Sequence, residues 1–436
     1  MAPRLVAPAL LASLLLTLTA TAAPSRVLVT EVPTADLASV TVLFGLDAWQ
    51  VPNGREGLPA LYTELAMFEM SKGLDEGAAG AAGLRDHLPG QRGIDVARRR
   101  DYLAITVNTT TSGLPAAVHF LLHYVLDAKF TQAELDLARR NVLKRRDAWA
   151  ASVIEPTEQL LVRAMWDGCV GVDPFGKPEG IKKVSLEDVQ EYVARMVTRD
   201  NTWLAVVAPA GVMSKELRQE AEQALAALPA SPRQLKPPRL GLGGRVVVEG
   251  MPGLDRASLA VGASLPPFGT REHWAGRLIR EMLASPGGRL EKDRGLLGRL
   301  GLLLPPGMSW RQLPVTALPV PFGRCSYLAV YAICYPARIE VARQGLVREL
   351  AALADGQFTD AELDRARLRV ANLWAQDMAA PRDLARMTAV AAMLGTKLPR
   401  PPEVAATVAD VTHEDVAAAA AGLLHRLSVG VELPQS

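Results

Sequence analysis

Cysteine is scarce in this sequence, with 3 residues among 436. Three cysteines allow at most one intramolecular disulfide, and their spacing does not indicate a cysteine metal site. Cys325 and Cys334 stand nine residues apart in one strand-like segment, so we expect them on opposite faces of a strand, too far apart to bond. Cys169 either pairs with one of them in three dimensions, or all three remain reduced thiols.

An excess of charge of one sign is also missing, because 48 basic residues face 46 acidic ones and the net charge is +2. The two basic clusters, Arg98–Arg100 and Lys144–Arg146, are not interleaved with aromatic residues. Nucleic-acid-binding surfaces usually concentrate positive charge and add aromatic side chains. We therefore interpret both clusters as solvated surface and expect no nucleic-acid partner.

Only one long apolar run occurs, Leu10–Leu18, which follows Arg4 and precedes the small residues Ala20–Ala22. The run is shorter than the roughly 20 residues that a bilayer-spanning helix needs, and the arrangement is typical of a secretory signal peptide. We therefore predict a signal peptide over residues 1–22. The mature chain is expected to be periplasmic or secreted, with no membrane span.

The chain contains an internal duplication. Asp127–Arg139 reappears as Asp355–Arg367, 228 residues later, and Val184–Val189 is echoed by Val411–Val416 after 227 residues. A period this long exceeds the roughly 20 to 50 residues of solenoid repeats. One domain fold is therefore used twice, in agreement with a length that suffices for two hydrophobic cores.

The two copies are joined by a segment rich in proline and glycine, residues 231–244, which cannot continue a helix or a strand. We predict a linker there, an N-terminal domain over residues 23–230 and a C-terminal domain over residues 245–436.

Helix starts recur at the same places in both halves. Thr131 and Thr359 each precede a glutamate by three residues, which is the pattern of a capping box, and Ser185 and Thr412 repeat it with an aspartate. Strand-like segments with apolar alternation or β-branched residues are 39–44, 103–109, 203–208, 245–248, 259–263, 327–333 and 429–433. Strands and helices are therefore expected to mix in each half.

Several segments stand in an order that resembles the insulinase/pitrilysin-like peptidase family. In the first half they are Gly57–Leu65, Arg100–Val107, Phe130–Arg146 and Asp173–Ala208, and in the second half Gly287–Leu290 and Arg294–Leu296 with the two capped segments. The resemblance covers nearly the whole mature chain. It implies an α+β fold of two homologous domains, each a mostly antiparallel sheet packed with helices.

The family binds zinc with an H-x-x-E-H motif on one helix and a glutamate on a later helix. In this sequence Ala60 and Glu64 fall at the two histidine positions, Thr63 falls at the catalytic glutamate, and Arg145 falls at the third ligand. Because the zinc ion needs both helical ligands, the resemblance implies no catalytic residue and no metal in this chain. We refer to Ala60, Thr63, Glu64 and Arg145 together as the vacated metal position.

Glu64 and Arg145 admit two interpretations: unrelated surface charges, or a salt bridge that occupies the vacated metal position. The second predicts that removing Arg145 orphans a buried charge at a cost of roughly 3 to 5 kcal/mol. The apolar stripe of the same helix, formed by Leu58, Leu61, Leu65 and Phe68, is interpreted as a buried face.

Two-subunit relatives in this family place zinc in one chain and a substrate-binding Arg/Tyr pair in the other. The resemblance puts that pair at Glu291 and Gly298, which cannot perform this role. Arg294 and Arg299 are possible substitutes. The sequence therefore predicts a degenerate substrate pair as well.

His119 and His123 are spaced to share one face of a helix, so a rebuilt metal site is an alternative. Three functions follow: a non-catalytic subunit that pairs with an intact zinc peptidase homologue to form a peptide-degrading chamber, a stand-alone peptide-binding or scaffold protein, and a peptidase with a rebuilt metal site. We favour the first, in which zinc is held only by the partner.

Overall fold

The computed structural model describes residues 26–33, 36–47, 50–52, 54–76, 83–89, 93–152, 154–166, 173–234, 243–251, 256–284, 288–292, 316–319 and 325–435. The predicted signal peptide and Cys169 lie outside these residues, as does most of the predicted linker. The domain boundaries stay predictions. Within the described segments, no helix combines the length and the apolar character that crossing a bilayer requires.

Each half contains a five-stranded sheet, and the two sheets have the same topology. The first contains β1 (Val27–Glu31), β2 (Leu37–Gly45), β3 (Ile94–Arg98), β4 (Tyr102–Thr110) and β5 (Thr202–Ala208), in the order β1-β5-β2-β4-β3. The second contains β6 (Val246–Met251), β7 (Ala257–Ser264), β8 (Thr316–Pro319), β9 (Tyr327–Cys334) and β10 (Ser428–Pro434), in the order β6-β10-β7-β9-β8. Only the pairs β1–β5 and β6–β10 are parallel among the strand pairs described. The predicted α+β fold with mostly antiparallel sheets is confirmed.

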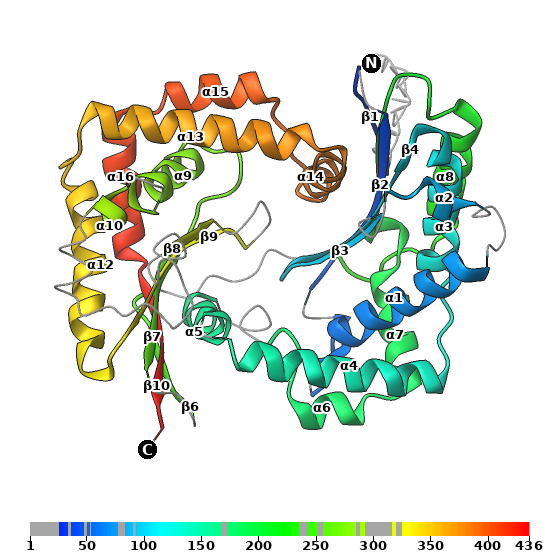
Figure 1. Cartoon of the computed structure of the whole chain (residues 1–436), viewed down its shortest axis with the longest axis horizontal. Coiled ribbons are helices and arrows are strands. Elements are labelled where there is room, and N and C mark those ends of the chain that lie inside the picture. The colour runs from blue at the N-terminus through cyan, green and yellow to red at the C-terminus, as the bar shows by residue number, and fades with distance from the viewer. Residues whose placement is uncertain are drawn as a thin grey trace, which may run out of the picture.

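The helices follow the same duplicated plan (Figure 1). The first half has α1 (Leu58–Glu76), α2 (Leu84–His87), α3 (Leu114–Leu121), α4 (Gln132–Ala150), α5 (Glu155–Met165), α6 (Pro178–Lys183), α7 (Leu186–Met196) and α8 (Lys215–Ala227). The second half has α9 (Arg271–Ala284), α10 (Arg289–Lys292), α12 (Ile339–Ala354), α13 (Asp360–Ala379), α14 (Pro381–Met393), α15 (Pro401–Ala409) and α16 (His413–His425). A short π-helical segment, η4 (Leu122–Leu126), continues α3.

The local predictions hold closely. Each of the seven strand-like segments overlaps a strand, and four complete capping boxes start α4, α7, α13 and α16 at Thr131, Ser185, Thr359 and Thr412. At Ser185 and Thr412 the third residue is an aspartate, whose shorter side chain still reaches back to the N-cap amide. The sequence patterns did not predict β1, β3 and β8, which are edge strands of four or five residues.

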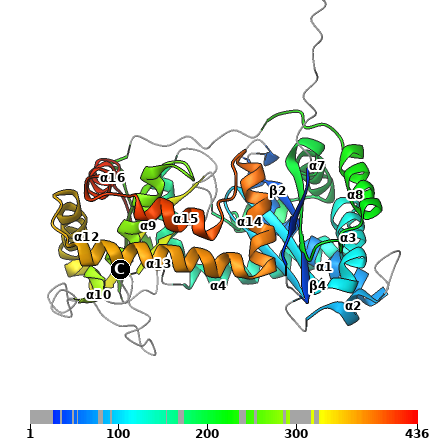
Figure 2. The same cartoon turned by 90° about the horizontal axis from the view of Figure 1, so that it is seen from above.

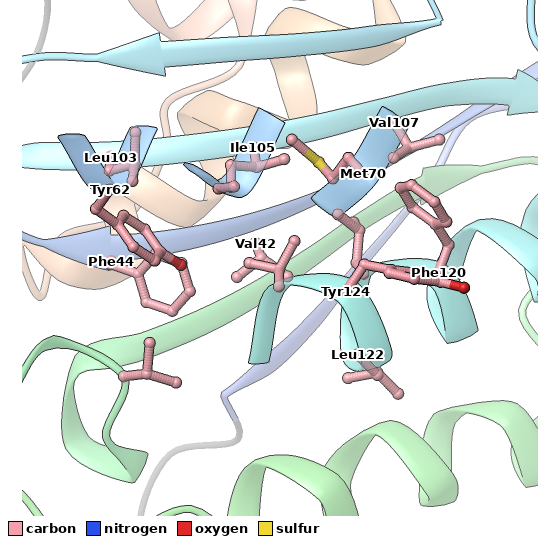
Figure 3. Packing of buried hydrophobic residues seen from close by; sticks show 14 of the residues in the cluster. Val42, Phe44, Tyr62, Met70, Leu103, Ile105, Val107, Phe120, Leu122 and Tyr124 are labelled. Atoms are coloured by element: carbon pink, nitrogen blue, oxygen red, sulfur yellow. The ribbon is translucent and has the colours of Figure 1, made fainter. Parts of the chain in front are cut away.

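Most helices cover the outer face of each sheet, meaning the face turned away from the other half. In the first half α1, α3, α7 and α8 bury the apolar residues that β2, β4 and β5 direct outward. Figure 3 shows this packing for Val42, Phe44, Leu103, Ile105 and Val107 of the sheet against Tyr62 and Met70 of α1 and Phe120 of α3. The second half repeats the arrangement with α9, α12, α13 and α16.

Two helices are exchanged between the halves, which the sequence patterns did not predict. Helix α5 of the first half packs on β10, β7 and β6 of the second sheet, and α14 of the second half packs on β2, β5 and β4 of the first. Figure 2 shows α13 crossing the molecule so that α14 lies beside β2. The two halves thus complete each other's inner faces.

The exchanged helices make both apolar and polar contacts. Ala389, Val390 and Ala391 of α14 lie in one buried cluster with Leu43 and Trp203 of the first sheet. A second cluster, between α5 and the second sheet, contains Leu161, Val162, Met165, Trp166, Tyr327 and Tyr331. Thr157 of α5 donates a 2.8 Å hydrogen bond to Glu432 of β10, and Arg386 of α14 lies 3.6 Å from Asp95 of β3.

The cysteines lie as their spacing predicts. Cys325 belongs to the cluster between α5 and the second sheet, whereas Cys334 belongs to the core on the other face of that sheet. Burial raises the pKa of the Cys334 thiol to about 11. Its thiolate is therefore rare at neutral pH.

Candidate functional site

Helix α1 carries three of the four residues of the vacated metal position. It begins at Leu58 with Pro59 in the first turn, where the missing amide proton costs nothing. Leu58, Leu61 and Leu65 are fully buried and Phe68 packs at the margin of the same core, so the predicted apolar stripe is confirmed. This stripe fixes the rotation of α1 and directs Glu64 toward α4.

Glu64 and Arg145 form a salt bridge, which resolves the alternative left open by the sequence. Arg145 Nη1 lies 2.7 Å from Glu64 Oε1, and Asn141 Nδ2 lies 3.4 Å from Glu64 Oε2. Asn141 and Arg145 are one helical turn apart on α4 and so reach the same carboxylate. The Glu64 side chain is 5% exposed, whereas that of Arg145 is 58% exposed.

The pair is therefore only half buried: the glutamate that loses its partner when Arg145 is removed is buried, as predicted, whereas Arg145 itself is exposed. The long arginine side chain extends from α4 to the solvent and leaves only its tip on the carboxylate. Water reaches the guanidinium and screens the interaction, so its free-energy contribution is smaller than that of a buried pair.

Ala60 and Thr63 supply no metal ligand. Ala60 is buried and apolar, and Thr63 donates its hydroxyl to the Pro59 carbonyl at 2.7 Å, within its own helix. Across the part of the chain that is described, no group of three or more His, Cys, Asp or Glu side chains is placed to hold a metal ion. The one acidic side chain at this position is occupied by Arg145 and Asn141.

Two further arginines lie near Arg145, Arg98 in space and Arg146 next to it in the chain. Arg98, at the end of β3, donates to the Pro174 carbonyl and lies over the ring of Phe175, 5.1 Å from its centroid. Burial, with a smaller contribution from nearby Arg145, lowers the pKa of Arg98 to about 10. Arg146 lies 3.3 Å from Asp173.

The interpretation of both basic clusters as solvated surface was therefore wrong for Arg98. The segment that contains Asp173, Pro174 and Phe175 packs over its guanidinium, a contact across more than 70 residues of sequence. Spacing along the chain carries no signal of such a contact.

The second half contains a related contact. Glu281 of α9 is 4% exposed and lies 3.6 Å from Arg369 of α13 and in contact with Arg280. Arg369 stands 228 residues after Asn141, at the duplicated position on the long capped helix. In each half, a buried glutamate of the first long helix therefore faces the capped helix. Glu64 of α1 faces Asn141 and Arg145 of α4, and Glu281 of α9 faces Arg369 of α13. This repetition indicates that Glu64 now has a structural role.

The predicted substrate pair cannot be placed completely. Glu291 lies in the short helix α10, between Arg289 and Lys292, and Gly298 lies outside the described residues, as do Arg294 and Arg299. Arg289 lies 3.3 Å from Glu362 of α13 and 3.7 Å from Glu349 of α12, so it anchors α10 to these two helices. The degenerate substrate pair stays a prediction.

His119 and His123 line a groove of about 930 Å³ between α3, η4, α7 and α8. His119 Nε2 lies 3.1 Å from Glu220 Oε2 of α8, and His123 is exposed with its ring edge against Tyr124. The groove floor is apolar, with Leu122, Val193 and Ala224 among its residues. His119 therefore faces one carboxylate, and in the described structure no group of three metal-ligating side chains forms around the pair.

A further contact that the sequence did not predict joins Arg100, which follows β3, to α5 and β9. Arg100 Nη1 donates to Gln159 Oε1 of α5 at 2.8 Å, and Tyr327 of β9 donates to Glu158 on the same helix. Burial is the main reason that the pKa of Tyr327 is raised well above its usual value. The contact joins three segments that are far apart in the chain.

A family model and several solved structures are similar to this chain. Residues 183–293 match the family model described as Peptidase M16 inactive domain. No curated protein matches the sequence. The match covers the end of the first half and the start of the second.

Three solved structures are similar over nearly the whole chain. A protease from Helicobacter pylori shares 15% identity with a TM-score of 0.75, over 94% of this chain and 98% of its own. A peptidase M16 inactive domain from Pseudomonas fluorescens shares 16% identity with a TM-score of 0.74, over 94% and 95%. A chain of complex III2 from Candida albicans with Inz-5 bound shares 13% identity with a TM-score of 0.71, over 93% of each.

Proposed function

We propose that this chain, an insulinase/pitrilysin-like homologue that has no zinc motif, is the non-catalytic subunit of an exported two-subunit peptidase. The observation that carries the proposal is the salt bridge between Glu64 and Arg145 at the position where the family holds its metal. A cation now occupies the third ligand position, and Ala60 supplies no imidazole. The match to an inactive M16 domain supports a non-catalytic homologue.

The partner in this proposal is an intact homologue that carries H-x-x-E-H and supplies the zinc. Each half packs one helix on the other half's sheet, and such shared cores suit a permanent wall of a chamber better than a mobile lid. One similar structure is a chain of a larger assembly, complex III2, so this fold also occurs within multisubunit proteins. A permanent complex of this kind would bury more than about 2,000 Å². Its substrates would be peptides, and the predicted signal peptide places it in the periplasm or outside the cell.

Elemental analysis of the purified mature chain, prepared without chelators, tests the non-catalytic part. We expect no stoichiometric zinc and no peptide cleavage by the chain alone, because two ligands and the general base are missing. About one tightly held zinc ion per chain would contradict this and favour a rebuilt site at His119 and His123.

Co-expression with the intact homologue tests the partnership. The two chains should elute together from size-exclusion chromatography at about twice the mass of either, and peptide cleavage should exceed that of the homologue alone. A homologue whose catalytic glutamate is changed to glutamine is the matched control, since it should keep the complex and lose the activity. Separate elution with unchanged activity would refute the subunit model and favour a stand-alone peptide-binding or scaffold protein.

A further inference from the structure

Strand β6 exposes two large apolar side chains at the edge of the second sheet. Val246 is 60% exposed and Val248 is 53% exposed. In the parallel register with β10 they stand beside Val429 and Val431, which are 6% and 7% exposed and belong to the core of the outer face. Residues at matching positions of paired strands point to the same face, so Val246 and Val248 continue the apolar outer face.

The inner face of the same strand is covered by α5. Gly430, the register partner of Val247, approaches α5 so closely that a Cβ atom there would lie 2.4 Å from the Leu161 amide nitrogen. Glu249 on this face contacts Arg163 of α5. Helix α5 therefore cannot cover Val246 and Val248, which alternate with these residues.

The first half shows how the corresponding face is covered. Strand β1 is the counterpart of β6, and its Val27 stands beside Leu204 of β5 in the same parallel arrangement. Val27 is only 2% exposed. Helix α8 packs on β1 and places Leu217, Ala221 and Leu225 in the core that contains Val27.

These three residues of α8 are four positions apart and form a narrow stripe on one side of the helix. The remaining residues of α8 are mostly charged or polar, so the helix buries one side and solvates the other. In the described part of the second half, no helix covers Val246 and Val248, which both stay more than half exposed. The same sheet position thus has a helical cover in one copy and exposed valines in the other.

We infer that the outer face of β6, with Val246 and Val248 at its centre, is a docking surface for an amphipathic α-helix of another polypeptide. The partner helix carries small and branched apolar residues every fourth position, like Leu217, Ala221 and Leu225, and polar residues elsewhere. A helix fits better than an added strand, because a strand would pair with the edge of β6 and leave the valine face in water. The inference is argued from the exposure of β6 and from the duplicated helix cover, and not from the proposed pairing with a peptidase.

The probe is a fluorescein-labelled synthetic peptide of residues 214–228, which comprises α8 and its caps. Titration of the mature chain, followed by fluorescence anisotropy, should show saturable binding. Changing Val246→Asp together with Val248→Asp should weaken binding at least about tenfold, which corresponds to ~1.4 kcal/mol. The matched control is Leu368→Asp, since Leu368 is 63% exposed on α13, and it should leave binding unchanged.

A second measurement separates weak affinity from a wrong assignment. A copy of residues 209–228 is appended after β10, because α8 follows β5 in the same way in the first half. The same protein carries Val248→Cys as the labelling site and Cys169→Ala. Cys325 and Cys334 are buried, so labelling by a maleimide reports on position 248. The appended helix should slow labelling at least about tenfold. Unchanged labelling together with no peptide binding, or peptide binding that survives the Val246 and Val248 changes, would overturn the assignment.

Discussion

Arg145 and Glu64 lie 2.7 Å apart, although 81 residues separate them in sequence and only the glutamate is buried. The carboxylate that stands at one of the family's histidine positions is therefore neutralised from the solvent side by an arginine on α4. Asn141 assists at 3.4 Å, which leaves neither carboxylate oxygen of Glu64 without a partner.

Replacing Arg145 should destabilise the fold moderately. Arg145→Ala leaves the Glu64 carboxylate with Asn141 as its remaining partner, and we expect a loss of about 1 to 3 kcal/mol in the free energy of unfolding. Urea denaturation measures it, with Arg140→Ala, an exposed position on the same helix, as the control. Glu64→Leu with Arg145→Leu should recover much of the loss, because no charge is then left unpaired. A variant Arg145→Ala that unfolds like the parent would show that the salt bridge contributes nothing.

The vacated metal position should regain zinc when its four residues are restored together. The changes are Ala60→His, Thr63→Glu, Glu64→His and Arg145→Glu, which recreate two imidazoles one helical turn apart and a carboxylate from α4. We expect about one zinc ion per chain by elemental analysis. The matched control keeps Arg145 and should bind zinc far more weakly, because a cation then faces the metal. Circular dichroism shows whether the quadruple variant is folded. A folded variant that binds no zinc would show that α1 and α4 no longer hold the required geometry.

The exchanged helix α14 should control the stability of the first sheet. Val390 is 1% exposed and packs on that sheet. Val390→Asp buries a charge there and should lower the free energy of unfolding by about 3 kcal/mol or more. Hydrogen exchange should show the loss of protection in β2 and β5, although the substitution lies in the second half. Ala375→Asp, at an exposed position of α13, is the control. Loss of protection confined to α14 would show that the first sheet does not need it.

His273 should make the second half sensitive to acid. It is 2% exposed and lies 3.1 Å from the Pro266 carbonyl through Nδ1, and burial, followed by the charge of Arg277, lowers its pKa from 6.5 to about 4. The unfolded chain therefore binds a proton that the folded chain does not, and this stability is fully present above pH 6.5 and is lost as the pH falls toward 4. The expected loss is about 1.4 kcal/mol per pH unit, or about 3 kcal/mol in all.

Urea denaturation between pH 7 and pH 4 measures this slope. His273→Gln should flatten it, since glutamine can still donate a hydrogen bond to Pro266 but does not titrate. The exposed His425→Gln is the control and should keep the slope of the parent. Equal slopes in all three proteins would mean that His273 is protonated in the folded state at acid pH.

The sequence by itself determined the local features of this protein. Four capped helices and seven of the ten described strands depend on residues within one turn or one strand of each other, and so leave a readable pattern. The duplication is readable because the same short segments recur 227 or 228 residues apart, and the loss of the zinc motif because its positions carry other residue types. The edge strands β1, β3 and β8 were not predicted, and in β3 the charges of Asp95 and Arg98 interrupt the apolar alternation.

Only the tertiary structure decided which elements meet. The apolar face of α14 does not indicate on which sheet the helix packs, and its exchange with α5 becomes visible only when both sheets are in place. The same holds for Arg98 under Phe175, for the Glu64–Arg145 salt bridge, and for the contrast between the buried Val27 and the exposed Val246. Apolar and charged side chains interact through space without regard to sequence separation, so periodicity identifies which faces must be covered but not the segment that covers them.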